Sequence, residues 1–409
     1  MTLTAPASLD ASIVPPASVR ARVLMLDLLS IVPYYTSELS AALLRRGDVE
    51  LELGAVTYYL DRGCYKRQRL SFAPGLVNVV SQVPRLPRAV RRISKTAEYL
   101  INLASLRLRS RTDLVHVQFL PLLLFGSTLE LRFLRSVQKN GVRVVYTVHN
   151  VLPHDAPPNL RALYAEVYRL ADHLICHDPS ARLRLMEEFG VATNRISVIA
   201  HGPLLRSEPR ASAGSSARER LGFADDACLV LWQGILRPYK GVDFLLDVWR
   251  RVQDKSARLA IVGGGDQAIE REIREKVGAL NLSGSVRLDL RFVSVEELQD
   301  YHAAADVLAY PYREVTTSGA LMTGIGYGKA VLASRLPAFE QILRHERNAL
   351  LADYGDVAEW SLQLARLIAD ARLRGRLGSS LSTGCNWDDI AAQTVACYES
   401  VLHQGSAAR

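Results

Sequence analysis

The chain has 409 residues, too many for a single hydrophobic core and suited to two domains. Hydrophobic residues make up 49% of the chain and charged residues 22%, which is typical of a globular protein and excludes an intrinsically disordered one. The net charge of +8 is moderate, so where the cations gather matters more than their total.

The amino-terminal residues and the cysteines indicate the compartment. Residues 1–19 are rich in Ala, Pro and Ser and lack a basic segment followed by an apolar core, so we expect a disordered tail and not a signal peptide. The most apolar window, residues 119–126, is far too short to span a membrane. Five scattered cysteines suggest neither a disulfide framework nor a zinc site. We therefore expect a cytoplasmic protein that is not integral to a membrane.

Apolar runs alternate with amphipathic segments in the first half of the chain. The expected strands are residues 22–29, 51–59, 114–118, 143–147, 173–176 and 196–199. The expected helices are residues 125–140, 159–171 and 179–189, preceded by one that runs to Arg46 from a cap at Thr36 or Ser37. This alternation predicts a parallel, doubly wound sheet.

A polar stretch rich in Ser, Ala and Pro (RSEPRASAGSSAR, residues 206–218) is the best candidate for a linker. A second alternation follows it. The expected strands are residues 229–232, 258–262, 286–290, 307–309 and 330–333, and the expected helices are residues 241–253, 267–279, 294–304 and 319–327, with a last amphipathic helix at 386–404.

The predicted fold is therefore α/β, with two Rossmann-like, doubly wound parallel-sheet domains that face each other across a cleft. The expected parts are an N-terminal domain at residues 20–205, a linker at 206–225, a C-terminal domain at 226–385 and a helix at 386–409 that packs back toward the N-terminal domain.

Two turns in the second half carry the strongest functional signal. Residues 234–241 (GILRPYKG) follow one buried strand, and residues 310–319 (YPYREVTTSG) follow another. Helix N-termini at the ends of such strands bind phosphate, because their unpaired N–H groups and the helix dipole favour an anion. With Arg237 and Lys240 at the first turn, the pair suits a nucleoside diphosphate.

These turns belong to an ordered series of motifs. The series is DLVHVQ at 113–118, TVHN at 147–150 with PHD at 153–155, ISVIAHG at 196–202, GILRPYKG at 234–241, IVGGG at 261–265, and SG at 318–319 before GKAV at 328–331. In this order the motifs resemble the two-Rossmann (GT-B) glycosyltransferases, most closely the bacterial family-4 type, over roughly residues 20–400. The resemblance implies transfer of a sugar from a nucleoside diphosphate donor, with retention of configuration and without a metal or other cofactor.

The resemblance also assigns roles to residues. It implies that the C-terminal domain holds the donor, the N-terminal domain holds the acceptor, and Arg237, Lys240 and His149 are catalytic. The implied donor-binding residues are Gly234, Gly263, Gly264, Glu314, Thr317, Ser318, Gly319 and His201. The acceptor-binding candidates are Tyr34, Tyr35, Thr36, Asn150 and His154. Each has a plainer alternative: glycines permit tight packing, a histidine is often a hydrogen-bonded core residue, and aromatic residues pack.

The sequence departs from the family pattern at two places. The usual arginine after the first C-domain strand is replaced by Ile235, with Arg237 two residues later. The family's paired glutamates, eight residues apart, fall on Val315 and Thr323, with Glu314 one position off. The second glutamate usually binds the donor ribose, so its absence leaves the base and the ribose contacts open.

One basic run points to a surface partner. Eleven cations stand between Lys66 and Arg111 against a single acid, Glu98. Residues 88–106 add an apolar helical stripe beside the basic face. A solvated charged face is the plain alternative, but a basic amphipathic helix at Arg85–Arg111 also fits an anionic membrane surface. Nucleic acid is a weaker explanation and is not expected, because the helix lacks interleaved aromatic residues apart from Tyr99 and no known binding motif is present.

The sequence thus predicts a cytoplasmic glycosyltransferase that is peripheral on the inner face of the cytoplasmic membrane. It would extend a lipid-linked glycan acceptor for an exopolysaccharide, capsule or lipopolysaccharide. Two alternatives remain open: a phosphorylase-like or epimerase-like enzyme of the same architecture, and a non-catalytic protein that binds a nucleotide sugar.

Overall fold

The computed structural model describes residues 20–56, 63–80, 83, 87–107, 112–152, 158–204, 214–252, 254–315, 318–381, 384 and 386–406. The expected tail at 1–19 and the ends of the basic run at Arg85 and Arg111 lie outside these residues.

Two six-stranded parallel sheets form the framework, which confirms the predicted fold class. The first sheet has the order β2-β1-β3-β4-β5-β6. Its strands are β1 (Ala21–Leu26), β2 (Val49–Gly54), β3 (Leu114–Val117), β4 (Arg143–Val148), β5 (His173–Cys176) and β6 (Ile196–Val198). The second sheet has the order β12-β11-β10-β7-β8-β9. Its strands are β7 (Leu229–Gln233), β8 (Arg258–Val262), β9 (Val286–Asp289), β10 (Val307–Tyr310), β11 (Ala330–Ser334) and β12 (Leu350–Ala352).

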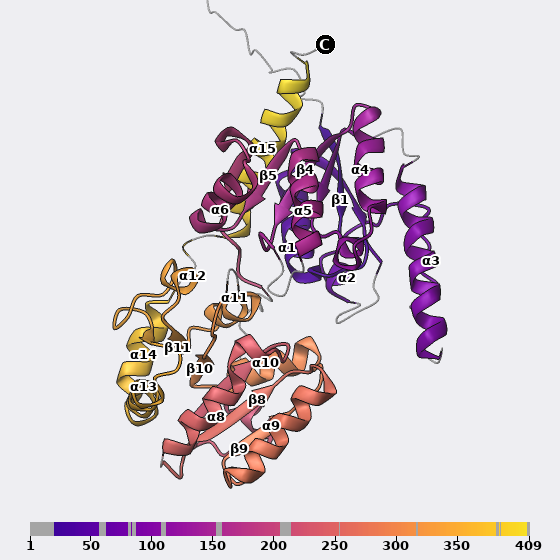
Figure 1. Ribbon diagram of the computed structural model, residues 1–409. Coiled ribbons are helices and arrows are strands. Elements are labelled where there is room, and N and C mark those ends of the chain that lie inside the picture. Colours follow the sequence, from indigo (N-terminus) through magenta and orange to yellow (C-terminus); the bar gives the residue numbers. More distant parts are fainter. Residues whose placement is uncertain are drawn as a thin grey trace, which may run out of the picture.

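Helices cover both faces of each sheet (Figure 1). In the first half they are α1 (Pro33–Arg46), α2 (Cys64–Arg67), α3 (Arg88–Arg107), η2 (Pro121–Phe125), α4 (Leu129–Lys139), α5 (Pro158–Leu170), α6 (Pro179–Phe189) and η3 (Thr193–Arg195). In the second half they are α7 (Gly214–Leu221), η4 (Pro238–Lys240), α8 (Val242–Arg251), α9 (Gln267–Ala279), α10 (Val295–Ala304), α11 (Gly319–Ile325), α12 (Pro337–Glu340), α13 (Val357–Ala369), α14 (Ala371–Ser379) and α15 (Trp387–Ser406).

Each sheet separates two cores because successive strand residues point to opposite faces. In β1, Leu24 and Leu26 join the core beneath α3, α4 and α5, whereas Val23 and Met25 join the core beneath α1 and α15. The inner strands are thus buried on both sides, which is why they read as continuous apolar runs, whereas the outer strand β2 alternates buried residues with the exposed Glu50 and Glu52.

Helix α15 belongs spatially to the first half of the chain although it comes last in the sequence. Figure 1 shows it as the yellow helix beside the indigo and magenta elements. Its residues Trp387, Ile390, Val395 and Tyr398 are buried in the same core as α1. The chain therefore passes between the two halves twice, once after β6 and again before α15.

Helix α7 falls inside the segment 206–225 that the sequence suggests as a linker. It packs on α10, and Ala217 is fully buried in the core of the second sheet. The sequence does not reveal this helix, because its only described fully buried side chain is the methyl group of Ala217 and it therefore shows no apolar periodicity. Residues 214–221 are therefore part of the C-terminal half.

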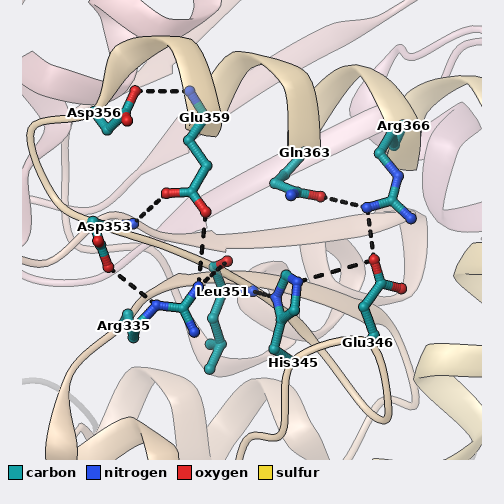
Figure 2. A network of polar contacts seen from close by, with 9 residues as sticks. All are labelled: Arg335, His345, Glu346, Leu351, Asp353, Asp356, Glu359, Gln363 and Arg366. Atoms are coloured by element: carbon teal, nitrogen blue, oxygen red, sulfur yellow. Dashed lines mark hydrogen bonds and ion pairs between the residues drawn. The ribbon is translucent and has the colours of Figure 1, made fainter.

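The outer strand β12 is covered by α13 and fixed by a polar network (Figure 2). Arg335 pairs with Asp353 at 3.1 Å, and the same aspartate's amide donates to Glu359 at 2.9 Å. Arg366 pairs with Glu346 at 2.7 Å. These groups are partly exposed, so each pair contributes about 0–1 kcal/mol to stability. Together they connect the segments next to β12 with α13.

Candidate active site

The two phosphate-type turns lie side by side in the structure. Strands β7 and β10 are neighbours, and β8 lies on the far side of β7, so the strand order reverses between β7 and β10. Ligands of open α/β sheets bind at the carboxyl ends of the strands at such a reversal. The turns also touch, since the amide of Arg313 donates to the carbonyl of Tyr239 at 2.7 Å.

Backbone packs directly on backbone around these turns. A Cβ on Gly263 would lie 1.9 Å from the carbonyl oxygen of Gly234, and one on Gly241 would lie 1.9 Å from that of Pro311. Gly234 and Gly263 also have φ of +144° and +140°, a region that favours glycine. The glycines thus allow the turns after β7, β8 and β10 to meet. Gly264 lies in the same place, against Phe292 after β9.

Lys240 and Arg237 give this edge of the sheet its positive charge. The Lys240 ammonium lies beside Gly234 and 5.6 Å from the centre of the Tyr312 ring. Burial, with a further contribution from Arg237, lowers the pKa of Lys240 to about 8. Arg237 is exposed, and neither cation forms an ion pair with any acid in the described part of the chain. Two cations held together without an acid favour an anionic ligand.

Helix α11 forms the other wall of the site. Ser318 caps it by accepting a hydrogen bond from the amide of Leu321 at 3.1 Å, and Gly319 lies against Leu204 of the first half. Glu314 is exposed on the turn before it, and Thr317 lies outside the described residues. Thr323 is buried and donates its hydroxyl to the carbonyl of Gly319 at 2.9 Å. It therefore cannot replace the missing ribose-binding carboxylate.

Three histidines line the opposing edge of the first sheet. His149 follows β4, His177 follows β5, and His201 follows β6. Burial lowers the pKa of His149 well below its usual range, with His177 and His201 adding to the effect. Burial also lowers the pKa of His177 to about 4 and that of His201 to about 3. All three are therefore neutral at pH 7.

His149 is held on both sides of its ring. Its Nε2 lies 3.1 Å from Oε1 of Gln118, and its Nδ1 lies 3.2 Å from Nε2 of His177. His177 in turn lies 3.1 Å from the carbonyl oxygen of Ile199 through Nδ1. The side chain of His149 is half-buried, so one part of it still faces solvent.

The structure divides the expected acceptor-binding residues. Asn150 is exposed and Tyr34 is half-buried, whereas His154 lies outside the described residues. Tyr35 is only 2% exposed, and its ring packs at 4.8 to 5.2 Å from the rings of three histidines and Trp387. Thr36 is buried and donates its hydroxyl to Asp27 at 3.1 Å.

Tyr35 and Thr36 are therefore interior residues rather than an acceptor surface. The reason is that α1 begins at Pro33, three residues before the expected cap, which turns both side chains inward. Asp27, which the sequence analysis missed, fixes this start by accepting the amides of Ile31 and Val32 at 2.8 and 3.1 Å. Burial raises the pKa of Asp27 to about 6.

A cavity of about 340 Å³ joins the two halves of the molecule. His177 and His201 line it from the first half, and Ser318 and Met322 line it from the second. Gln393 of α15 completes its wall. The structure thus places His201 opposite the cap of α11, in the cleft between the sheets.

Asp27, Gln118 and His177 are the residues of this region that the sequence analysis missed. Each is a polar residue at the end of a buried apolar strand, and this shared position was the available signal. Gln118 is fully buried. A polar residue there must find a partner inside the protein, which marks it as a member of a hydrogen-bonded network.

Two facing sheets of this topology, with a cationic site at the reversal point of one of them, define the GT-B class of fold. The structure superposes on that of HepE from Anabaena in complex with UDP and glucose, with a TM-score of 0.67 at 18% identity over 95% of this chain and 100% of that one. It also superposes on sucrose-phosphate synthase from Thermosynechococcus elongatus, with a TM-score of 0.71 at 18% identity over 94% of this chain and 100% of that one.

Sequence comparison identifies the family. The model described as glycosyltransferase family 4 matches residues 32–202, and the model described as glycosyl transferases group 1 matches residues 227–370. One model falls in each half, and together they cover most of the chain. The chain belongs to the group 1 (family-4) glycosyltransferases.

Curated relatives carry the name D-inositol 3-phosphate glycosyltransferase. The protein from Thermobifida fusca is 27% identical over 286 residues, which is 64% of this chain and 65% of the relative. The protein from Streptomyces bingchenggensis is 27% identical over 249 residues, which is 58% of this chain and 54% of the relative. The match thus spans less than two thirds of the length of these two relatives.

Proposed function

We propose that this protein transfers a sugar from a nucleoside diphosphate donor to a hydroxyl of a lipid-linked glycan in the synthesis of a bacterial surface polysaccharide. The observation that carries the donor assignment is the pair Arg237 and Lys240 at the reversal point of the second sheet, unpaired by any described acid. UDP is bound in the structurally similar HepE from Anabaena and MnaA from S. aureus, which supports the same class of donor.

The two cations have a direct catalytic use. When the bond from the sugar to the diphosphate breaks, negative charge develops on the leaving phosphate. Fixed cations that are already in place stabilise this charge without reorganising, which is the largest electrostatic contribution a site of this kind offers. The half-buried ammonium of Lys240 is the stronger contributor, because its surroundings screen charge less than water does.

Retention of configuration fits the acceptor side of the cleft. A retaining transfer needs no dedicated base, whereas an inverting one needs a base near the acceptor hydroxyl. His149, whose ring nitrogens lie within hydrogen-bonding distance of Gln118 and His177, would be the first candidate base of an inverting transfer, but a retaining transfer does not need it to remove a proton. We therefore assign it the role of orienting a substrate hydroxyl.

The proposal of a lipid-linked acceptor is based on the outer face of α3. Glu98 and Asn102 are buried toward the protein and accept the amides of Val77, Val79 and Val80 at 2.7 to 2.9 Å. The opposite face exposes Ile93, Leu100 and Ile101 at 71%, 36% and 54%, beside the cations of the basic run. An exposed apolar face with flanking cations fits docking on the anionic inner face of the cytoplasmic membrane, where lipid-linked glycans lie.

No helix among the described residues is long and apolar enough to cross a bilayer. Attachment would therefore run through the surface of α3. The relatives' name suggests another acceptor, a phosphorylated cyclitol, which would not need such a surface.

A panel of UDP-, GDP- and dTDP-sugars tests the proposal. We expect slow hydrolysis of one donor, and transfer when membrane lipid extract is added, with the anomeric configuration of the product read by NMR. A phosphorylase-like enzyme would release sugar phosphate, an epimerase-like enzyme would interconvert the sugars, and a binding protein would turn over none of them. Inositol phosphate as the better acceptor would refute the lipid-linked assignment.

Two further measurements address the chemistry. Lys240→Ala and Arg237→Ala should each reduce turnover by roughly 100- to 1,000-fold, the cost of losing one preorganised contact to a developing anion. Lys255→Ala, an exposed cation at the opposite end of β8, is the matched control and should be neutral. Activity should also persist in EDTA, because the two cations supply the charge that a metal ion would otherwise supply. Recovery of activity only with magnesium or manganese would contradict this.

A further inference from the structure

A chain of buried polar side chains crosses the first sheet at the carboxyl ends of its strands. It begins on α15, where the hydroxyl of Tyr398 lies 2.6 Å from Nδ1 of His116 on β3. Nε2 of His116 lies 3.1 Å from the amide nitrogen of Gln118, and Gln118 reaches His149. The chain ends through His177 at the backbone of Ile199, after β6.

Counting protons along this chain fixes the state of each ring. The carbonyl of Ile199 can only accept a hydrogen bond, so Nδ1 of His177 must carry the proton. A neutral His177 then has a bare Nε2, which can only accept. The contact at 3.2 Å therefore requires a proton on Nδ1 of His149, and a neutral His149 has a bare Nε2.

The bare Nε2 of His149 conflicts with the carbonyl oxygen of Gln118 at 3.1 Å, because both atoms are acceptors. The oxygen and nitrogen of a glutamine amide are distinguished by the hydrogen-bond network, and turning the amide over resolves the conflict. The Gln118 nitrogen then donates to His149, and its oxygen accepts from Nε2 of His116. His116 keeps a bare Nδ1 for the hydroxyl of Tyr398.

Each contact along the chain then joins one donor to one acceptor, and no ring needs a second proton. Burial favours that solution over a charged ring, since it lowers the pKa of His116 to about 3, that of His177 to about 4, and that of His149 well below its usual value. The hydroxyl of Thr147, 2.7 Å from Nε2 of His116, also accepts from the N–H of that ring nitrogen.

We infer that His177 is a positioning residue that holds His149 in the tautomer protonated on Nδ1, with Gln118 donating to Nε2 until a substrate hydroxyl takes its place. This rests on the proposed function for its catalytic meaning. It also states what His149 recognises: Nε2 can accept from a sugar hydroxyl but cannot donate to a phosphate oxygen. The hydroxyl groups of the substrate therefore bind at the first sheet, and its diphosphate binds at Lys240 and Arg237 on the second.

The tautomer can be observed without any substrate. Two-bond nitrogen–proton correlation spectra of the full chain, labelled with ¹⁵N at histidine, distinguish a bare ring nitrogen from a protonated one, and His149→Asn identifies the signals. We expect a protonated Nδ1 and a bare Nε2 on His149. A protonated Nε2, alone or together with Nδ1, would overturn the inference.

Variants at position 177 test the positioning. His177→Phe removes the acceptor, so His149 should lose its preference for one tautomer. His177→Gln can still accept from His149 and should preserve it. Gln118→Glu removes the donor and sets a carboxylate against Nε2, so the pKa of His149 should rise. His302→Phe replaces another buried histidine in the opposite half and should leave His149 unchanged.

Transfer kinetics give the functional reading. His177→Phe should lower kcat about tenfold, the size of one hydrogen bond, with the donor KM nearly unchanged, and His177→Gln should recover most of it. Wild-type kcat in His177→Phe would refute the positioning role, and equal losses in both variants would show that only packing matters. If the spectra give the expected tautomer but no donor is turned over, the proposed function fails and the tautomer stands.

Discussion

The ammonium of Lys240 is placed where a charge is costly without a partner. It is half-buried beside Gly234 and close to a second cation, and both conditions disfavour its protonated form. A bound diphosphate would reverse this balance, because an opposite charge favours the protonated form. Donor binding and proton binding at Lys240 are therefore linked.

This linkage predicts how donor affinity depends on pH. With a pKa of about 8 in the free protein, Lys240 loses its charge as the pH rises through that value. We expect the donor Kd, measured by calorimetry between pH 7 and 9.5, to rise steadily above pH 8. Lys240→Arg keeps its charge over this range and should flatten the dependence. An equal rise in both proteins would show that another group titrates.

Burial of the His302 side chain lowers the stability of the fold. It is fully buried on α10, its ring stacks on that of Tyr327 at 4.6 Å, and neither of its nitrogens meets a hydrogen-bond partner in the described part of the chain. Burial lowers its pKa to about 3, with Lys329 contributing. The unfolded chain binds a proton at this residue near pH 6.5, whereas the folded chain does not. Its presence therefore destabilises the fold increasingly as the pH falls from 6.5 toward 3.

We predict that His302→Phe stabilises the protein. At pH 7.5 the gain should be about 1–3 kcal/mol, the cost of a buried polar group without a partner. At pH 5 it should grow by about 2 kcal/mol, because the variant avoids the proton uptake on unfolding. Urea unfolding of both proteins at the two pH values measures this difference. A gain that does not depend on pH would mean that His302 is charged or hydrated in the folded state.

The residues of the site were predictable where a motif fixed the backbone. Gly234, Lys240 and Ser318 lie at strand ends or helix starts that the sequence shows directly. Tyr35 was not predictable, because its burial depends on where α1 begins, and that start is set by Asp27 through contacts to amides rather than by a local cap. The partnership of His177 with His149 depends on the pairing of two strands that the sequence does not specify.

Among the elements, α3 has an unusual distribution of polarity. Its inward face buries Tyr99, Leu103 and Leu106 in the core together with a glutamate and an asparagine that hold the loop before it, and its outward face carries further large apolar side chains. The periodicity of the sequence shows an apolar stripe but not which way it points, so a stripe facing the core was equally compatible with it. Figure 1 shows the helix at the rim of the first half, with its outer side uncovered.

We predict that the outward face of α3 binds membranes. Ile93→Gln together with Ile101→Gln should abolish binding to phosphatidylcholine vesicles that contain phosphatidylglycerol, since each fully buried side chain contributes about 1.5–3 kcal/mol. Arg92→Gln with Lys95→Gln should weaken binding at low salt, at about 1 kcal/mol per cation. Sedimentation with vesicles measures both, and donor hydrolysis should be unchanged.

Leu362→Gln provides the control for this experiment. Leu362 is 62% exposed on α13 of the other half, so its replacement changes an exposed apolar side chain without touching α3. Vesicle binding that falls equally in this variant would indicate a general loss of surface hydrophobicity. Binding that survives in the double isoleucine variant would show that the face of α3 is only a solvated surface.

Some elements were predicted closely, whereas α13, α14, β12 and α7 were not predicted. The helices α6 and α9 and the strands β5 and β8 begin and end where the sequence indicates. The strand β12 has only three residues, too few for a periodic pattern, and is defined by its pairing with β11. Helix α7 was not predicted for a related reason: its packing on α10 is a tertiary contact that the local sequence does not show.

At the scale of the whole molecule, α15 packs against the segment after β6 where the chain crosses between the two halves. The indole nitrogen of Trp387 donates to the carbonyl of Pro203 at 2.7 Å, immediately after β6 and its loop. Gly202 lies beneath the same ring. The two passages of the chain thus touch each other, and the same helix supplies Tyr398 to the polar chain that reaches His149. Packing at this crossing and the orientation of the acceptor side are therefore connected.

The crossing gives the last prediction, made with two glycine substitutions. A Cβ on Gly202 would lie 2.5 Å from the Trp387 ring and 2.9 Å from Ile390, so Gly202→Ala must displace the start of α15. Overpacking of this kind costs about 1–3 kcal/mol in unfolding free energy. Gly278→Ala, inside α9 with nothing near its Cβ, should instead gain about 0.5–1 kcal/mol in unfolding free energy.

Because the second sheet is untouched, Gly202→Ala should keep donor hydrolysis while losing transfer to the acceptor. Loss of both activities in equal measure would show that α15 supports the donor side as well, and an unchanged transfer rate would disconnect the crossing from the acceptor side.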